Sequence, residues 1–237
     1  MDRLQVPGVA PASSPGDDGL RLQNRLGASR SPYVRGHMHN PVAWQTWGPE
    51  AIELARRSDR LLFLSIGYAA CHWCHVMERE SFENQDVAAM LNASFIPVKI
   101  DREERPDVDR IYMNYVQALS GQGGWPLNVF LTPHLQPIFG GTYFAGPGST
   151  VAQRGKPGFV DILDKMRTVW QNERPRCLDS AREETRKLFD FAQDGNISRQ
   201  DSAEHDGIEL EVLDDALSVS ATPSPALHSA QPHTDAR

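Results

Sequence analysis

Hydrophobic residues along the chain form either short continuous runs or a helical spacing, and the two patterns alternate. Continuous apolar runs of strand length lie at 61–66, 95–100 and 127–131, and such runs are typical of strands covered on both faces. A further strand is expected around 137–144. Helical spacing occupies most of the segments between these runs. The pattern therefore predicts the order helix, strand, helix, strand, helix, strand, strand, helix.

Residues suited to helix ends support this order. A first helical turn is expected from Asn40 to Trp47, and Pro49 is suited to the first position of the next helix. Asn84 can cap a later helix, and a helix that begins at Pro106 can end at Gly121. The last expected helix carries apolar residues on one face from Phe159 to Trp170.

The connections between the strands predict how the sheet is built. Strands separated by helices are expected to run parallel, because a parallel pair needs a long crossover connection. The last two strands are joined by a short loop, which allows only an antiparallel hairpin. The predicted fold is therefore α/β, with a mixed central sheet flanked by helices, and this is the thioredoxin-like arrangement.

Charge divides the chain into a neutral body and an acidic end. Residues 191–237 hold nine acidic residues against two arginines, which accounts for the whole net charge of −7. Residues 194–237 contain no aromatic residue, and residues 1–20 are rich in Pro, Gly, Ser and Ala. Such segments bury too little apolar area to offset their chain entropy. We therefore expect disorder at 1–20 and 191–237, with one thioredoxin-like domain at 21–190.

Composition excludes several classes of protein. Three cysteines in 237 residues are too few for a scaffold held together by disulfides. The longest apolar run, 61–71, is interrupted by Ser65 and Gly67 and is too short to cross a bilayer. The neutral body lacks the basic stripe that nucleic-acid binding needs. The first residues do not resemble a signal or transit peptide, so we expect a cytoplasmic location and neither a membrane nor a nucleic-acid partner.

The chemistry expected of the chain centres on Cys71-x-x-Cys74, where a buried strand passes into a helix. A cysteine exposed at the amino end of a helix lies among unpaired backbone N–H groups that stabilise its thiolate. Cys71 is therefore the expected nucleophile, and Cys74 is the second thiol that resolves a mixed disulfide. A protonated His72 would favour the thiolate further, and Trp73 would form part of an apolar surface that faces the substrate.

The partners expected for such a dithiol follow from its chemistry. The substrate is a disulfide-bearing protein or a small-molecule thiol compound, and an unidentified electron donor returns the dithiol to its starting state. We expect no cofactor and no metal.

A second feature of the predicted site is Pro126, which follows Gly123-Gly124-Trp125 directly before an apolar run. In the thioredoxin arrangement, the loop opposite the dithiol carries a proline whose peptide bond is cis. We therefore expect a cis Trp125–Pro126 bond that faces the cysteines. A proline at the first residue of a strand is also permitted without any such role.

Five stretches of the sequence carry a resemblance to one family. They are Asn40-Pro41-Val42-x-Trp44, Cys71 to Phe82, Lys99 to Asp109, Gly123 to Leu127 and Gly140 to Phe144. Together they closely resemble the thioredoxin-like domain of the spermatogenesis-associated protein 20 (YyaL-like) family, in register over about residues 24 to 175. The resemblance implies a thioredoxin fold with Cys71 and Cys74 as the redox pair.

The sequence departs from related proteins at two places. Full-length members of the family continue into a large helical barrel, so this chain is interpreted as an isolated first domain or a truncated product. Ser65 stands six residues before Cys71, where thioredoxins usually hold a buried acid. Deprotonation of Cys74 then needs another group, and Glu78 or a water is the expected substitute. The expected supporting residues are His72, Trp73, His75, Glu78, Trp125 and Pro126.

Three other interpretations of the motif remain open on the sequence. Cys71-x-x-Cys74-His75 has the spacing of a haem attachment site, although a strand–turn–helix context does not suit haem. Cys71, Cys74, His75 and a histidine of the pair His37-x-His39 could bind zinc, but the second half of a zinc motif is missing. The domain could also be a non-catalytic interaction or redox-sensing module, because a fold does not imply a function.

Other charged and reactive residues are expected to be structural. The charged run from Lys99 to Arg110 is interpreted as a solvated loop and the start of a helix. Cys177 has no partner at a useful spacing and is expected to be an inert thiol in a helix.

Overall fold

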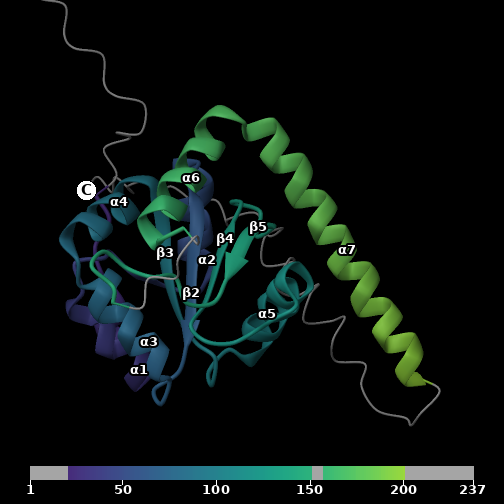
Figure 1. The fold of residues 1–237 in the computed structure, drawn as a ribbon, viewed down its shortest axis with the longest axis horizontal. Helices are drawn as coiled ribbons and strands as arrows, with labels where there is room; N and C mark the ends of the chain where they lie inside the picture. Colours follow the sequence, from purple (N-terminus) through teal and green to yellow (C-terminus); the bar gives the residue numbers. More distant parts are fainter. Residues whose placement is uncertain (1–20, 151–156, 201–237) are drawn as a thin grey trace, which may run out of the picture.

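The computed structural model describes residues 21–150 and 157–200, and Figure 1 shows their fold. Strands form one mixed sheet in the order β1-β3-β2-β4-β5. β2 is parallel to β3 and antiparallel to β4, and helices lie on both faces, so the fold is thioredoxin-like as predicted. The bounds of the strands are Gln45–Thr46 (β1), Leu61–Gly67 (β2), Phe95–Asp101 (β3), Leu127–Leu131 (β4) and Pro137–Gly141 (β5).

The helices surround this sheet and differ greatly in length. The α-helices are α1 (Pro32–Gly36), α2 (Pro49–Ser58), α3 (His72–Met77), α4 (Gln85–Ser94), α5 (Pro106–Ser120), α6 (Phe159–Asn172) and α7 (Arg174–Gln200). Short 3-10 helices lie at Leu26–Ala28 (η1) and His37–His39 (η2). A π-helical turn at Glu78–Phe82 (η3) directly continues α3.

Two hydrophobic cores lie on opposite faces of the sheet, and β2 contributes to both. Its side chains alternate between the faces because successive residues of a strand point in opposite directions. Leu61 and Phe63 belong to the core that α1, α3, α4 and α6 cover. Leu62, Leu64 and Ile66 belong to the core that α2 and α5 cover. Every residue of β2 is buried, which explains why its sequence is a continuous apolar run.

The direction of β4 corrects the expectation that every strand reached through a helix runs parallel. β4 follows α5 but pairs antiparallel with β2, with Leu127 opposite Ile66. A helical connection is long enough to return the chain to either end of the sheet, so it permits a parallel pair without requiring one. Here residues 121–126 bring the chain back to the end of the sheet where β2 stops. Pro126 therefore lies level with the carboxyl end of β2.

The segment from Asn40 to Trp47 is a second correction, because it is not a helical turn. Residues 40–42 form bends, and Gln45–Thr46 form the edge strand β1, which pairs parallel with β3. The side chain of Gln45 fixes this conformation by donating hydrogen bonds to two backbone carbonyls. Pairing with the edge of the sheet thus outweighs the local spacing of apolar residues, which is a weak preference.

The other helix ends lie where the sequence signals place them. Pro49 and Pro106 begin α2 and α5, and Gly121 ends α5 in a left-handed conformation with φ of 71°. The last helix, α7, was not predicted as an element, and it continues past residue 190, where the acidic tail is expected to begin. Residues 1–20 and 201–237, for which disorder is expected, lie outside the described residues.

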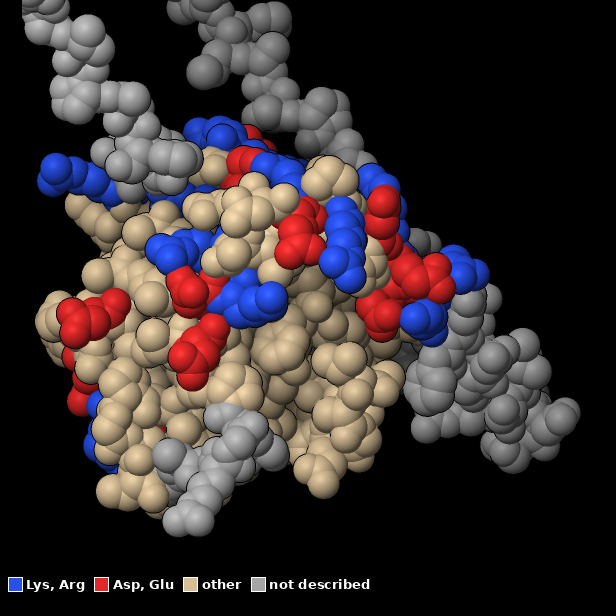
Figure 2. Space-filling view, turned by 45° about the horizontal axis from the view of Figure 1, so that its top comes forward, with Lys and Arg blue, Asp and Glu red and all other residues tan. Residues whose placement is uncertain are grey.

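The surface over α6 and α7 carries both signs of charge. α7 runs past β5, and its carboxyl end stands away from the sheet (Figure 1). Basic and acidic residues on α7 form pairs three positions apart, such as Arg182 with Asp179 and Arg186 with Glu183. Figure 2 shows that the two signs are interleaved over this face and do not gather into a patch of one sign.

No helix within residues 21–150 and 157–200 combines the length and the apolar character that a bilayer span requires.

Replacing Asn84 with Ala should lower the free energy of unfolding by about 1 kcal/mol. The side-chain oxygen of Asn84 accepts hydrogen bonds from the backbone N–H groups of Asp86 and Val87, at 2.9 and 3.1 Å, at the start of α4. Urea unfolding followed by circular dichroism measures the change. Asn114→Ala, at an exposed position within α5, is the control and should change stability by less than about 0.5 kcal/mol. Equal losses in the two variants would contradict the capping role.

Candidate functional site

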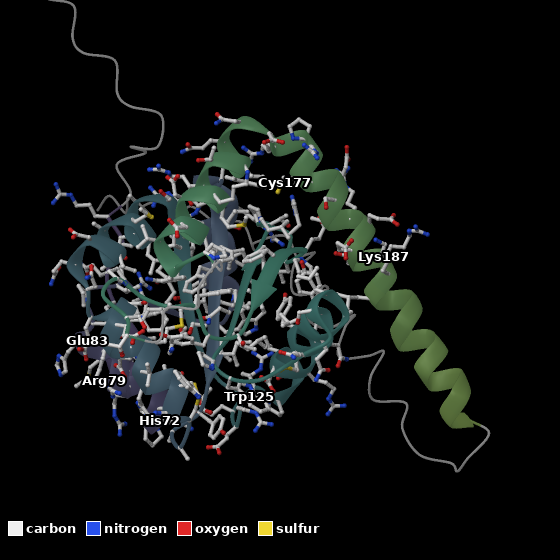
Figure 3. All side chains as sticks on the ribbon, in the orientation of Figure 1. His72, Arg79, Glu83, Trp125, Cys177 and Lys187 are labelled. Carbon is white, nitrogen blue, oxygen red and sulfur yellow. A yellow bond between two sulfur atoms is a disulfide. The ribbon has the colours of Figure 1, made fainter. Side chains whose placement is uncertain are left out.

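The candidate site lies where β2 leads into α3, at the end of the domain where Figure 3 labels His72 and Trp125. Cys71 and Cys74 are joined by a disulfide, and their Cα atoms are 5.3 Å apart. Cys71 is the N-cap residue of α3, and its Sγ accepts a hydrogen bond from the backbone N–H of Cys74 at 3.2 Å. Once the disulfide is reduced, the same N–H can stabilise the negative charge of a Cys71 thiolate.

The exposure of the dithiol differs from the expectation that Cys71 is exposed. The side chain of Cys71 is 4% exposed in the disulfide state, and that of Cys74 is 1% exposed. Both cysteines belong to a hydrophobic core against which Tyr68, Trp125 and Tyr143 pack, together with other partly buried residues. The exposed part of the motif is instead the dipeptide between the cysteines, in which Trp73 is 41% exposed.

The Trp125–Pro126 peptide bond is cis, as the sequence predicts. Trp125 is fixed by three neighbours. Tyr68 contacts it edge-on at 5.7 Å between ring centres, the Arg102 guanidinium lies 4.0 Å from its ring centre, and its Nε1–H donates to Asp109 at 2.7 Å. Because Tyr68 directly follows β2, this contact holds the proline loop beside the start of the dithiol motif.

A second loop reaches the exposed side of the motif. Tyr143, which follows β5, has its ring centre 5.0 Å from that of Trp73. The Tyr143 hydroxyl donates a hydrogen bond to the carboxylate of Glu80, which also accepts one from Ser149 at 3.0 Å. Glu80 lies in η3, so it ties the loop after β5 to the helix that carries the dithiol. Nothing in the sequence pattern indicates this place for Tyr143 beyond the motif in which it stands.

A polar cluster connects η3 to η2 and to Asn40, which follows η2. Nδ1 of His37 lies 2.9 Å from Oε1 of Glu78 and 3.0 Å from Oδ1 of Asn40. The Asn40 amide also donates to Oε1 of Glu78 at 3.2 Å. The other carboxylate oxygen of Glu78 lies 3.6 Å from Nδ1 of His75. The expected supporting residues Glu78 and His75 therefore lie together, and His37 joins them.

Burial and hydrogen bonding set the charges in this cluster. Burial lowers the pKa of His37, and the positive charge of Lys99 lowers it further, against an opposing hydrogen bond with Glu78. Burial alone would raise the pKa of Glu78. Its contacts with His37 and Asn40 and the positive charge of Lys99 have the opposite, larger effect, so the pKa of Glu78 lies well below its ordinary value. A carboxylate with so low a pKa is a weak base, so Glu78 is poorly suited to take a proton from Cys74.

Lys99 is buried in β3, which corrects its interpretation as part of a solvated loop. It lies opposite Ser65 of β2, and its Nζ donates a hydrogen bond to the Ser65 hydroxyl at 3.0 Å. The rings of Phe82, Tyr33 and Trp44 surround the amine, with centres 4.7, 5.1 and 5.3 Å from Nζ. Burial lowers the pKa of Lys99 to about 7, against the charge of a nearby carboxylate. The sequence feature that indicates this buried amine is a single lysine within an otherwise apolar strand.

Cys71, Cys74, His75 and His37, which were considered for zinc, each have another partner. Cys71 and Cys74 are joined to each other, and Nε2 of His75 lies 2.8 Å from the backbone oxygen of Ala69. His37 is occupied by its contacts in the polar cluster. Over the described ranges 21–150 and 157–200, no group of three or more His, Cys, Asp and Glu residues is arranged to hold a metal ion.

Cys177 lies far from the dithiol. Figure 3 shows it on α7, at the opposite end of the domain from His72. Its side chain is free and buried, and this burial raises the pKa of the thiol, against the nearby charge of Arg174. A thiol with a raised pKa is a poor nucleophile at neutral pH, which agrees with the inert role expected for it.

The domain should become more stable between pH 7 and about pH 9.5 because of Lys99. The pKa of Lys99 is about 7 in the folded protein and 10.5 ordinarily. Between these values the unfolded chain binds a proton that the folded protein does not, so raising the pH favours the folded state. Lys99→Met should remove about 1 to 3 kcal/mol of this rise.

Urea unfolding of the oxidised protein at the two pH values measures the effect. Lys165→Met removes an exposed lysine of α6 and is the control that should leave the rise unchanged. An equal rise in the wild-type protein and Lys99→Met would show that Lys99 is protonated in the folded state throughout.

Two curated relatives match most of this chain. Spermatogenesis-associated protein 20 of Homo sapiens is 44% identical over 186 residues, which cover 78% of this chain and 23% of that protein. An uncharacterized protein of Caenorhabditis elegans is 46% identical over 179 residues, which cover 76% of this chain and 24% of that protein. The chain thus spans about a quarter of the length of these relatives.

A solved structure and a family also match this chain. The solved structure of a DsbH oxidoreductase aligns with a TM-score of 0.39 at 15% identity, and the alignment covers 55% of this chain and 85% of that one. Residues 23–189 match the family Thioredox_DsbH, which is described as a protein of unknown function, DUF255. The chain belongs to this family.

Proposed function

We propose that this domain is a thiol–disulfide oxidoreductase that acts through Cys71 and Cys74. The observation that supports this most directly is the disulfide between them at the start of α3, where the Cys74 N–H donates to Sγ of Cys71 at 3.2 Å. The cis Trp125–Pro126 loop beside the motif gives further support, because it occupies the place that the thioredoxin arrangement predicts for it.

The proposed reaction has two steps of exchange. In the reduced protein, the Cys71 thiolate attacks one sulfur of a substrate disulfide, forms a mixed disulfide and releases the first substrate thiolate. Cys74 then attacks Sγ of Cys71, closes the Cys71–Cys74 disulfide and releases the second substrate thiol. The substrate gains two electrons and two protons, and a separate thiol reductant must return two electrons to the dithiol.

The residues between the cysteines are proposed to govern access and reactivity. Trp73 is exposed and contacts Tyr143, so the two rings form an apolar surface next to the sulfurs. His72 is exposed beside Trp73, and its protonated form would favour the Cys71 thiolate. A protonated His72 would thereby make the disulfide more oxidising.

The remaining supporting residues are proposed to position the motif. Trp125 and Pro126 present the loop against which a substrate peptide would lie. Glu78 and His75 hold α3 and its π turn through the polar cluster, and His75 also contacts the backbone oxygen of Ala69 just before the motif. We propose the cytoplasm as the location, since a dithiol that reduces substrates needs a compartment with thiol reductants.

A second candidate function is a redox-sensing or interaction module without turnover. The 4% exposure of Cys71 favours it, because a buried sulfur exchanges slowly with bulky disulfides. The two functions differ in turnover, since a sensor forms its disulfide once in response to an oxidant and does not reduce substrate repeatedly.

Reduction of insulin disulfides in the presence of dithiothreitol should be accelerated by the protein and abolished in Cys71→Ser and Cys74→Ser. Cys177→Ser is the matched control, because it removes the remaining cysteine, at the other end of the domain, and should keep full activity. Cys74→Ser should also hold substrates covalently on Cys71, and mass spectrometry of non-reduced conjugates identifies them. Folded protein with free thiols and no turnover would favour the sensing module, and tightly held zinc in the reduced protein would favour a metal site.

Trp73→Ala should raise KM for a protein disulfide by about fivefold or more while changing kcat little, because an exposed aromatic next to the sulfurs contributes to substrate capture. Its stability should change by less than about 0.5 kcal/mol. Leu119→Ala is the control, since Leu119 is 51% exposed on the last turn of α5 and lies outside the motif. Steady-state kinetics with reduced insulin as product distinguish the two, and an unchanged KM in Trp73→Ala would remove the proposed role.

A further inference from the structure

The hydroxyl group of Tyr33 is a buried polar group with no hydrogen-bond partner. Tyr33 lies in α1, its side chain is 4% exposed, and its ring packs in the same core as the dithiol. Among the described residues, three buried side-chain oxygen atoms lack a partner, and the Tyr33 hydroxyl oxygen is one of them, beside one oxygen each of Ser81 and Asn128. A buried hydroxyl without a partner is unfavourable, so such a group in a folded protein calls for an explanation.

The hydroxyl of Tyr33 lies next to the sulfur of Cys74, across the backbone of Gly67. A Cβ atom placed on Gly67 would lie 2.3 Å from the Tyr33 hydroxyl oxygen and 2.6 Å from Sγ of Cys74. Both atoms therefore border the same small space, at the end of β2. Any residue larger than glycine at position 67 would collide with both atoms, so glycine is what leaves this space open.

The surroundings of Tyr33 keep its hydroxyl protonated. Burial raises its pKa, and the negative charges of Glu78 and Asp101 raise it further. The Lys99 amine faces the Tyr33 ring, and His37 contacts that ring edge-on at 5.2 Å between centres. The group is therefore a hydrogen-bond donor across the physiological pH range. In the disulfide state, the neighbouring Cys74 sulfur is a weak acceptor, whereas a thiolate is a strong one.

We infer that the Tyr33 hydroxyl donates a hydrogen bond to the sulfur of Cys74 when the disulfide is reduced, and that it thereby stabilises the Cys74 thiolate. Tyr33 thus acts on the thiol that a buried acid serves in thioredoxins, at a site where this chain has Ser65 hydrogen-bonded to Lys99. The Tyr33 proton stays on its oxygen throughout.

The consequence for turnover rests on the proposed function. During resolution, the Cys74 thiolate attacks Sγ of Cys71, the bond from Cys71 to the substrate sulfur breaks, and the proton that Cys74 lost to water is taken up by the leaving substrate thiolate. The hydrogen bond from Tyr33 raises the fraction of Cys74 present as thiolate, so it speeds this second step. The first step, attack by Cys71, does not involve Tyr33.

The direct test is a titration of Cys74 alone. In Cys71→Ser/Cys177→Ser, Cys74 is the one remaining thiol, and serine is a favoured N-cap residue, so α3 keeps a cap where Cys71 provides one. Thiolate absorbance in the ultraviolet gives the pKa of Cys74 without any need for turnover. Adding Tyr33→Phe should raise this pKa so that the thiolate fraction at neutral pH falls about tenfold. The fold should persist, because the deleted hydroxyl has no partner in the disulfide state.

Tyr112→Phe in the same background is the matched control. Tyr112 is also a buried tyrosine, but its hydroxyl donates to the backbone oxygen of Leu135 at 3.1 Å. It should leave the Cys74 pKa unchanged. An unchanged Cys74 pKa in Tyr33→Phe, or an equal shift in both tyrosine variants, would overturn the inference.

Single-turnover exchange with a labelled protein disulfide tests the role in turnover, with all cysteines present. In Tyr33→Phe, formation of the mixed disulfide should keep its rate, resolution should slow about tenfold, and raising the pH should restore it. Slowing of both steps together would indicate a structural effect and would overturn the role in resolution. If wild-type protein exchanges no disulfide while the Cys74 pKa still depends on Tyr33, the proposed function fails and the hydrogen bond stands.

Discussion

The pairing of β2 on both of its edges determines where everything else in the site lies. β2 is held parallel to β3 on one side and antiparallel to β4 on the other, with every residue buried. Its carboxyl end therefore has one fixed position, from which the chain passes into the dithiol motif. The same end is met by the cis peptide bond at the start of β4, because β4 runs the opposite way. A slip of one residue in either pairing would move each side chain of β2 to the other core.

The elements with strong local signals could be predicted from the sequence. The apolar runs of β2, β3 and β4 are continuous because both faces are covered, and the ends of α4 and α5 follow from Asn84 and Gly121. The cis bond at Trp125–Pro126 could also be predicted, since it depends on the fold and on a proline at one position.

Features that depend on distant partners could not be predicted in this way. β1 is a strand because it meets the edge of β3, and the local spacing of its apolar residues suggests a helix instead. The direction of β4 depends on the path of the loop after α5. Tyr33 precedes Cys74 by many positions and has an ordinary surrounding sequence, so nothing local marks it as a neighbour of the dithiol.

The burial of Lys99 shows how a polar core can be built around the dithiol without a carboxylate on β2. Its amine is shared between one hydroxyl and three aromatic rings, and rings interact favourably with a cation through their electron-rich faces. The negative charge that acts on this amine is supplied instead by Glu78, from the turn after α3, where His37 and Asn40 stabilise it. Charge balance in this core is therefore divided between a strand and a helix, so the relative position of the two elements affects the electrostatics of the dithiol.

The π turn after α3 determines which way its side chains point. Three residues of this turn, Glu78–Phe82, have different partners. Glu78 contacts the polar cluster, and Glu80 binds the loop after β5. Phe82 is fully buried, and its ring centre lies 5.0 Å from that of Trp44. A π turn accommodates one residue more than an α-helical turn, and each residue of an α-helix turns the chain by about 100°. A regular α-helix over the same residues would turn Phe82 to a different direction relative to Glu78, so the wider turn is what lets Glu78 reach the polar cluster while Phe82 reaches the core.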